Sequence, residues 1–256
     1  MIEKWPVTIP ALTGRRKRNV YVYLPEEALA EEPGARFPVL YMFDGHNVFF
    51  DEDATYGKSW GMKEYLEASG APLMVEAVEC NHSPRQGRLC EYTPYSFDDP
   101  HFGHIPARGK KYMDWLVHTL KPAIDAEYPT LPERETTWIA GSSMGGLMSL
   151  YAALAYNGVF SRAACLSPSL GFVREPLMQL VQRAALQTDT ILYMDYGSRE
   201  MAHHPGMQET FAAFSAALLQ RGVALTSRIV PGGEHCEACW EEQIPFFMDV
   251  LTYTHE

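Results

Sequence analysis

The stretch that most constrains the fold of this chain is Gly141-Ser142-Ser143-Met144-Gly145, which lies between a predicted strand and a predicted helix. Residues 136–140 read TTWIA, which is typical of a strand, and apolar residues at helical spacing follow the glycines. Glycine two residues before and two residues after a serine removes the Cβ atoms that would clash where strand and helix are pressed together. The pattern predicts a strand-turn-helix with Ser143 at its tip, the position of a catalytic nucleophile.

Strand-like and helix-like segments alternate along the rest of the chain. The predicted strands are 19–24, 38–43, 72–78, 136–140, 162–166, 190–196 and 224–230. The predicted helices are 58–68, 112–127 with a bend at Pro122, the helix after Gly145, 175–185 and 208–220. Continuous apolar runs such as 38–43 indicate strands that are buried on both faces. This order predicts an α/β fold in one domain over residues 1–256, with a mostly parallel central sheet and helices on both faces.

A serine nucleophile needs an adjacent base, and the base needs a carboxylate that fixes its tautomer. His235 follows the predicted strand 224–230 and a Gly-Gly turn, so we interpret it as the base. Glu200 lies in the predicted loop just beyond strand 190–196 and is our preferred acid. Asp195, inside that strand, is the alternative, and Glu234 is interpreted as a solvated turn residue.

Two backbone amides are candidates for holding the negative charge that develops on a substrate carbonyl oxygen. Met144 follows Ser143 and opens the predicted helix, where unpaired N–H donors favour an anion. The buried strand 38–43 ends in a glycine-containing turn, Asp44-Gly45-His46. Because ligands of parallel sheets bind at the carboxyl ends of the strands, the N–H of His46 is the second predicted donor.

The segment 79–109 is polar, aromatic and irregular, and we expect it to form a lid or a wall of the substrate pocket. It contains three histidines that lack the spacing of a helix-borne ligand pair: His82, His101 and His104. The pair Cys236-x-x-Cys239 has no second pair that would complete a zinc site. We therefore expect neither a metal nor a cofactor.

The charge balance restricts the partners of the chain. Asp and Glu number 32 against 21 Lys and Arg, which gives a formal net charge of −11. This balance disfavours nucleic acid and anionic membranes and fits a small-molecule substrate. The N-terminus shows no basic region followed by an apolar one, and the five cysteines lack framework spacing. We expect a soluble, cytoplasmic protein with reduced thiols, and the sequence leaves open whether it forms a homo-oligomer.

Five motifs together resemble one family. They are residues 41–45 (YMFDG), 91–94 (EYTP), 141–146 (GSSMGG), 197–200 (GSRE) and 231–235 (PGGEH). From about residue 20 to the C-terminus the chain is similar to the putative-esterase family of α/β-hydrolases, which includes esterase D, feruloyl and acetyl-xylan esterases and enterochelin esterases. The resemblance implies an α/β-hydrolase fold and assigns the nucleophile to Ser143, the base to His235 and the acid to Glu200. Aspartate is the commoner acid in the family, and glutamine often stands where this chain has His46.

The reaction that we predict is hydrolysis of a small carboxylic ester through an acyl-enzyme on Ser143. His235 would act as base and then as acid, Glu200 would orient it, and the Met144 and His46 amides would hold the oxyanion. Three alternatives remain open: an acyltransferase with the same residues, a non-catalytic binding protein on a hydrolase scaffold, and a metal-dependent hydrolase that uses the histidines of segment 79–109.

Overall fold

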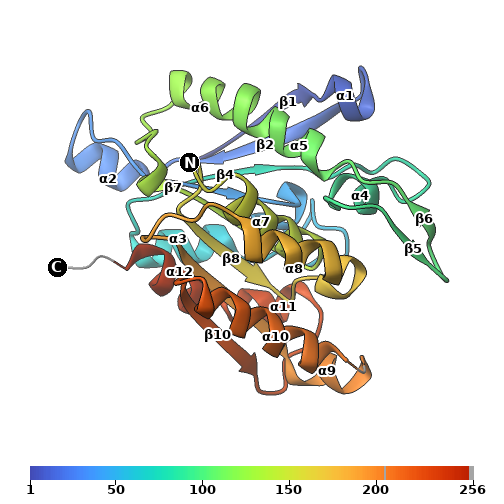
Figure 1. The fold of residues 1–256 in the computed structure, drawn as a ribbon. Helices are drawn as coiled ribbons and strands as arrows, with labels where there is room; N and C mark the ends of the chain where they lie inside the picture. Colours follow the sequence, from blue (N-terminus) through green and yellow to red (C-terminus); the bar gives the residue numbers. More distant parts are fainter. Residues whose placement is uncertain (205, 254–256) are drawn as a thin grey trace.

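The computed structural model of the protein describes residues 1–204 and 206–253, and its centre is one eight-stranded sheet (Figure 1). The strand order is β1-β2-β4-β3-β7-β8-β9-β10. The pairs β1–β2 and β2–β4 are antiparallel, and every pair from β4 to β10 is parallel. The prediction of a mostly parallel sheet is therefore confirmed. The strands are β1 (Ile2–Thr8), β2 (Lys17–Tyr23), β3 (Val39–Met42), β4 (Met74–Val78), β7 (Thr137–Ser142), β8 (Arg162–Leu166), β9 (Ile191–Gly197) and β10 (Ala224–Val230).

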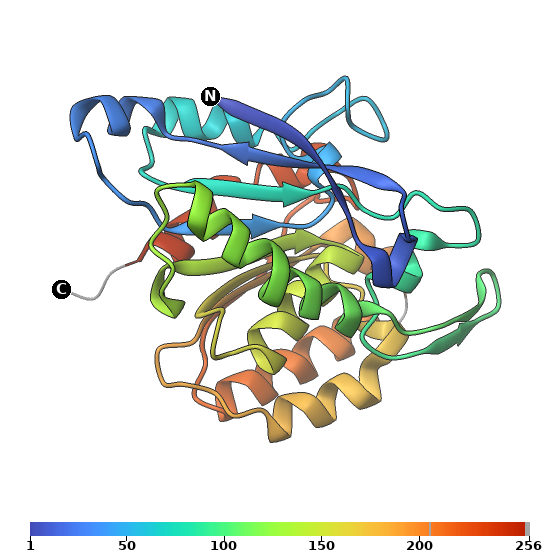
Figure 2. The same cartoon turned by 90° about the horizontal axis from the view of Figure 1, so that it is seen from above.

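Helices cover both faces of this sheet (Figures 1 and 2). The α-helices are α1 (Pro10–Thr13), α2 (Glu26–Glu31), α3 (Met62–Ser69), α4 (Gly87–Glu91), α5 (Gly109–Trp115), α6 (Lys121–Glu127), α7 (Met144–Ala155), α8 (Arg174–Arg183), α9 (Ser198–His203), α10 (Met207–Gln220), α11 (Glu237–Glu241) and α12 (Ile244–Thr252). Shorter helical segments are η1 (Gly45–Asn47), η2 (Leu116–Leu120), η3 (Arg134–Thr136) and η4 (Leu170–Val173).

Alternation along the strands divides the apolar side chains into two cores. Val39 and Tyr41 of β3 face the core that α5, α7, α8 and α10 cover. Leu40 and Met42 of the same strand face the core that α3 and α12 cover. Because successive side chains of a strand point to opposite faces, a strand buried on both sides must be apolar at every position. This explains why β3 reads as a continuous apolar run.

Three local predictions were wrong. Segment 79–109 is not structureless, because it contains α4 and a small hairpin of β5 (Phe97–Asp99) and β6 (Gly103–Ile105). The irregularity in the predicted helix 112–127 is the π-helical segment η2, and Pro122 lies after it in the first turn of α6, where proline is tolerated. Glu200 lies in the first turn of the short helix α9 and not in a loop.

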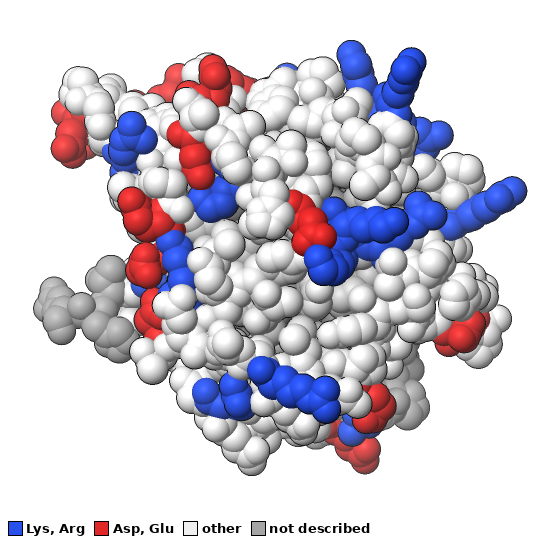
Figure 3. Space-filling view, turned by 45° about the horizontal axis from the view of Figure 1, so that its top comes forward, with Lys and Arg blue, Asp and Glu red and all other residues white. Residues whose placement is uncertain are grey.

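The surface carries both signs of charge in spite of the net charge of −11. Figure 3 shows lysine and arginine side chains gathered on the face that includes β1, α5 and α6. Exposed basic residues of this region are Arg15 and Arg16 before β2, Lys17 at its start, and Lys110 and Lys111 in α5. The prediction that nucleic acid is excluded therefore rests on the net charge and not on a uniformly acidic surface. None of the helices in the described residues is long and apolar enough to span a membrane.

A carboxyl group is buried in the first core without a hydrogen-bond partner among the described residues. Glu76 of β4 is fully buried, and neither of its carboxyl oxygens is paired. The hydroxyls of Tyr41 and Tyr112 are also buried and unpaired. Burial raises the pKa of Glu76 well above its ordinary value, because an ionised carboxylate is poorly solvated in the core. The folded protein therefore keeps Glu76 protonated to a higher pH than the unfolded chain does.

This protonation predicts a pH dependence of stability. The folded state retains a proton that the unfolded chain releases above a pH of about 4.3, so the free energy of unfolding falls as pH rises through that range. Glu76→Gln removes this titration. As pH rises, the free energy of unfolding of Glu76→Gln minus that of the wild type, both measured by urea denaturation, should increase by about 1.4 kcal/mol per pH unit. This increase continues while the folded carboxyl of the wild type stays protonated. The exposed Glu64→Gln is the control, and equal pH profiles of wild type and Glu76→Gln would contradict the prediction.

Candidate active site

Ser143 occupies a strained turn between β7 and α7. β7 ends at Ser142 and α7 begins at Met144, so Ser143 alone connects strand and helix. Its backbone has φ 57° and ψ −121°, a combination that non-glycine residues rarely adopt. The Ser143 amide donates to the Leu166 carbonyl at 2.9 Å, and its hydroxyl lies 3.4 Å from the hydroxyl of Ser169. The structure thus holds the side chain at the tip of the turn, as the sequence pattern predicts.

Close backbone contacts explain the glycines around Ser143. A Cβ atom on Gly141 would lie 2.8 Å from the carbonyl carbon of Gly145, and one on Gly145 would lie 2.9 Å from Cβ of Phe43. Atoms at these separations overlap, so a larger residue would push α7 away from the sheet. The two glycines therefore keep strand and helix close enough for the turn to form.

Glu200 and His235 form a direct contact. Nδ1 of His235 lies 2.7 Å from Oε2 of Glu200, and because a carboxylate only accepts hydrogen bonds, Nδ1 is the donor. The Glu200 side chain is 2% exposed, whereas that of His235 is 46% exposed. Burial opposes ionisation of Glu200, but hydrogen bonds from His235, Ser167 and the Gly197 amide outweigh it and lower the pKa. Because Nδ1 is hydrogen-bonded to Glu200, Nε2 is the ring nitrogen of His235 that this contact leaves available.

A second close backbone approach brings this pair together. A Cβ atom on Gly197, at the end of β9, would lie 2.2 Å from the carbonyl oxygen of Gly233. Arg199 adds a hydrogen bond from its amide to the same carbonyl at 3.1 Å. The turn after β10, which carries His235, therefore lies directly on the start of α9, which carries Glu200.

Asp195, the alternative acid, is hydrogen-bonded to Tyr193 and Ser167 and not to His235 among the described contacts. Its Oδ2 accepts from the Tyr193 hydroxyl at 2.8 Å, and its Oδ1 accepts from the Ser167 amide at 3.1 Å. Burial raises the pKa of Asp195 to about 7, against the effect of these hydrogen bonds. In the geometry of the described residues, Glu200 contacts His235 and Asp195 supports the backbone of Ser167.

Ser167 connects several of these groups, and sequence reasoning did not identify it. Its hydroxyl donates to Oε1 of Glu200 at 2.6 Å and accepts from Nε1 of Trp240 at 3.2 Å. The ring of Trp240 in turn packs edge-on against that of His235, with centroids 5.0 Å apart. The signal in the sequence is the Ser-Pro-Ser turn directly after β8, at the same edge of the sheet. Ser167 therefore positions the carboxylate of Glu200.

The predicted oxyanion donors lie on two neighbouring segments of this edge. Met144 is the first residue of α7, where N–H groups have no acceptor within the helix. His46 lies in η1, directly after β3, and a Cβ atom on the preceding Gly45 would lie 2.5 Å from the Ala77 carbonyl oxygen. This turn is therefore packed tightly on the end of β4.

An arginine that the sequence analysis did not single out holds the turn before His46. Nε and Nη2 of Arg88 each lie 2.7 Å from an oxygen of Asp44, which is a bidentate pair. Burial disfavours the charge on Asp44, but Arg88 outweighs it and lowers the pKa. The Asp44 amide also donates to the Tyr92 hydroxyl at 3.2 Å. Segment 79–109 is thus fastened to the turn that carries His46.

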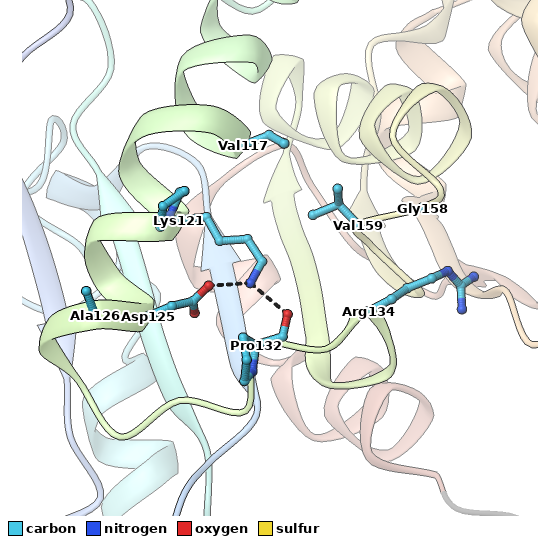
Figure 4. Close-up of a pocket in the computed structure, with 9 residues that line it drawn as sticks. Val117, Lys121, Asp125, Ala126, Pro132, Arg134, Gly158 and Val159 are labelled. Carbon is cyan, nitrogen blue, oxygen red and sulfur yellow. Dashed lines mark hydrogen bonds and ion pairs between the residues drawn. The ribbon is translucent and has the colours of Figure 1, made fainter.

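Ser143, His235, His46 and Arg88 border one cavity of 660 Å³. Its lining comes from the turn 44–47, from Thr55 and Tyr56, from several residues between 80 and 89, and from Phe102, Ser143, His235 and Trp240. The structure therefore brings Ser143, His235 and His46 to a common cavity, and segment 79–109 supplies much of its wall. A different hollow lies beside α6 (Figure 4), where the Lys121 ammonium is bound by Asp125 and the Pro132 carbonyl. Pro132 and Arg134, which precede β7 in the chain, line that hollow. It therefore lies at the amino-terminal edge of the parallel strands, opposite the edge that carries Ser143.

The three histidines of segment 79–109 do not come together. His104 contacts Asp98 at 2.9 Å on an exposed surface, and His101 packs on Phe102. His82 instead lies beside His46 and Cys80.

A mostly parallel sheet that is covered on both faces, with a serine on a strained strand-to-helix turn at its carboxyl edge, defines an α/β-hydrolase. The family described as "Putative esterase" matches residues 12–246. The chain belongs to this family and is a carboxylic ester hydrolase by class.

One curated relative is similar in sequence, and solved structures are similar in fold. The chain is 25% identical over 187 residues to the uncharacterized protein YbbA of Bacillus subtilis (strain 168), which covers 72% of this chain and 69% of YbbA. It is similar in fold to a ferulic acid esterase, with a TM-score of 0.71, 17% identity and coverage of 98% and 97% of the two chains. An IroE-like serine hydrolase from Shewanella oneidensis matches with a TM-score of 0.73, 18% identity and coverage of 98% and 79%.

The contact between Gly197 and Gly233 predicts the effect of one added methyl group. Gly197 has φ −73°, which any residue can adopt, so Gly197→Ala acts by crowding: its Cβ atom would overlap the Gly233 carbonyl and lie 3.0 Å from Oε1 of Glu200. The turns must separate, and we expect kcat/KM for a p-nitrophenyl ester to fall by about 100-fold. Gly158→Ala is the matched control, because a Cβ atom there meets nothing within 4 Å. A Gly197→Ala variant with unchanged kcat/KM would contradict this role of the contact.

Proposed function

We propose that the protein is a serine esterase that hydrolyses a small carboxylic ester, with Ser143 as nucleophile, His235 as base and Glu200 as acid. The observation that carries the proposal is the 2.7 Å contact between Glu200 and His235 beside the cavity into which Ser143 is held. Glu200 keeps the proton on Nδ1, so Nε2 is free to accept the proton of the serine hydroxyl. Membership of the esterase family supports the same reaction.

The reaction proceeds in two halves. Ser143 Oγ attacks the ester carbonyl carbon while His235 takes the hydroxyl proton, and the amides of Met144 and His46 stabilise the resulting oxyanion. Collapse of the tetrahedral intermediate breaks the bond to the alcohol, which leaves with the proton from His235. Water then attacks the acyl-enzyme with His235 again as base, and the carboxylic acid is released.

The cavity supports a substrate of modest size. Its volume of 660 Å³ is in the range of small-molecule sites. Aromatic side chains line it beside polar ones: Tyr56, Phe102 and Trp240. The five cysteines are all free thiols, which fits action in a reducing compartment such as the cytoplasm.

Replacement of the nucleophile tests the reaction class. Ser143→Ala should abolish hydrolysis of p-nitrophenyl acetate, because the remaining groups cannot form an acyl-enzyme. A fluorophosphonate should label the wild type at Ser143 and should not label the variant, as measured by intact mass. Far-UV circular dichroism controls for folding. Hydrolysis that persists in Ser143→Ala, or a wild type that is not labelled, would reject the proposed nucleophile and favour a binding protein.

The two carboxyl groups are separated by matched amide substitutions. Glu200→Gln removes the negative charge, and because donors from Ser167 and Gly197 hold the Oε1 position, the amide NH2 faces Nδ1 of His235 and favours the wrong tautomer. We expect kcat to fall by up to about 10⁴-fold. Asp195→Asn keeps the Glu200–His235 contact, so its loss of kcat should be much smaller. Both variants are nearly isosteric, so urea unfolding midpoints can be compared to exclude a general loss of stability. A larger loss of kcat in Asp195→Asn would make Asp195 the acid.

A further inference from the structure

Three side chains with metal-binding atoms meet at the ends of β3 and β4. His46 follows β3, and Cys80 and His82 follow β4. One potential ligand atom from each of the three lies within 4.8 Å of the other two. Sγ of Cys80 is 4.0 Å from both ring nitrogens of His82, and the rings of His46 and His82 meet edge to face with centroids 4.6 Å apart.

The His46 ring has one nitrogen that the protein does not use. The residue is 5% exposed, and its Nε2 lies 3.0 Å from the hydroxyl of Thr55. Nδ1 is buried and has no hydrogen-bond partner among the described residues. A buried polar atom without a partner is unfavourable. Metal-bound histidines characteristically pair their second ring nitrogen with a neighbouring polar group, as Thr55 does here.

The donor set indicates the kind of cation. One thiolate sulfur and two imidazole nitrogens suit Zn²⁺ and related late transition metals, whereas Mg²⁺ and Ca²⁺ prefer oxygen ligands. Zn–N and Zn–S bond lengths place the ligands of a tetrahedral site about 3.3–3.6 Å apart. The separations here are larger: Sγ of Cys80 is 4.0 Å from the His82 ring nitrogens, and the three ligand atoms lie within 4.8 Å of one another. Because His82 is exposed, its ring can approach without disturbing the buried residues.

Neighbouring charges are compatible with a cation. The carboxylate of Asp44 is a negative charge next to the Cys80 thiol. The positive charge closest to this carboxylate, on Arg88, is already neutralised by its bidentate pair with Asp44. On metal binding the Cys80 thiol releases its proton to solvent and the sulfur bonds to the cation.

We propose that His46, Cys80 and His82 form a binding site for a Zn²⁺-type cation, with a fourth position open to the cavity that also contains Ser143. All three residues line that cavity. The sequence predicts no metal here, because these residues lack the regular spacing of a helix-borne ligand pair. The cluster instead combines a turn after one strand with a turn after its spatial neighbour. The site is separate from the proposed hydrolysis, which uses none of the three side chains.

Zn²⁺ titration tests this site directly. Reduced wild-type protein, titrated with Zn²⁺ by calorimetry and by competition with a chromophoric chelator, should bind one equivalent at this site, and Mg²⁺ should not compete. Cys80→Ser and His82→Ala should each weaken Zn²⁺ affinity by at least about 10-fold. Cys90→Ser and His101→Ala are the matched controls, since both residues come from segment 79–109 and lie outside the cluster, and they should bind as the wild type does.

Two results would overturn the proposal. The first is unchanged Zn²⁺ affinity in both Cys80→Ser and His82→Ala, with thermal unfolding used to show that these variants are folded. The second is loss of the Zn²⁺ equivalent in the Cys236→Ser/Cys239→Ser double variant alone, which would assign it to that thiol pair. Ser143→Ala should bind Zn²⁺ as the wild type does. The metal site is therefore tested even if Ser143 proves not to be the nucleophile.

Discussion

At the carboxyl edge of the sheet, backbone packs directly against backbone, and every group of the site depends on these contacts. The absence of a side chain at Gly141 and Gly145 lets β7 and α7 approach closely enough to hold Ser143 at φ 57°. The contact of Gly197 with Gly233 places the turn of His235 on the start of α9. Since the contacts of Gly141 and Gly197 are with main-chain atoms, the sheet itself sets the relative positions of these turns, and flexible side chains do not.

A second layer of polar contacts fixes the orientation of those groups. Ser167 holds Glu200 and is itself held by Asp195 and Trp240. On the other side of the cavity, the pair of Arg88 with Asp44 fastens the turn of His46 to segment 79–109. The buried pair of Arg18 with Glu91, at 2.5 and 2.9 Å, ties the same segment to β2. A long connection with little regular structure is thereby held as a cavity wall.

The fold and the candidate site were predictable to different degrees. Strands 162–166 and 224–230 were predicted with the bounds that the structure has, because continuous apolar runs and alternation are strong local signals. The helix of Glu200 and the small hairpin of segment 79–109 were missed, because such short elements are stabilised by contacts with distant residues. The antiparallel strand β1 was also missed, since its half-exposed pattern around Pro6 resembles a terminal loop.

Periodicity and turn chemistry are local properties, so the chain alone was enough to predict a parallel α/β sheet, a strained turn at Ser143 and a histidine after the last strand. Local sequence patterns do not decide between Glu200 and Asp195 as the partner of His235. Their distance along the sequence is small, and only the packing of β9 against the turn after β10 shows which carboxylate reaches His235. The same holds for the meeting of His46 with Cys80 and His82, because neighbours in a parallel sheet are far apart in the chain and no local pattern records their contact.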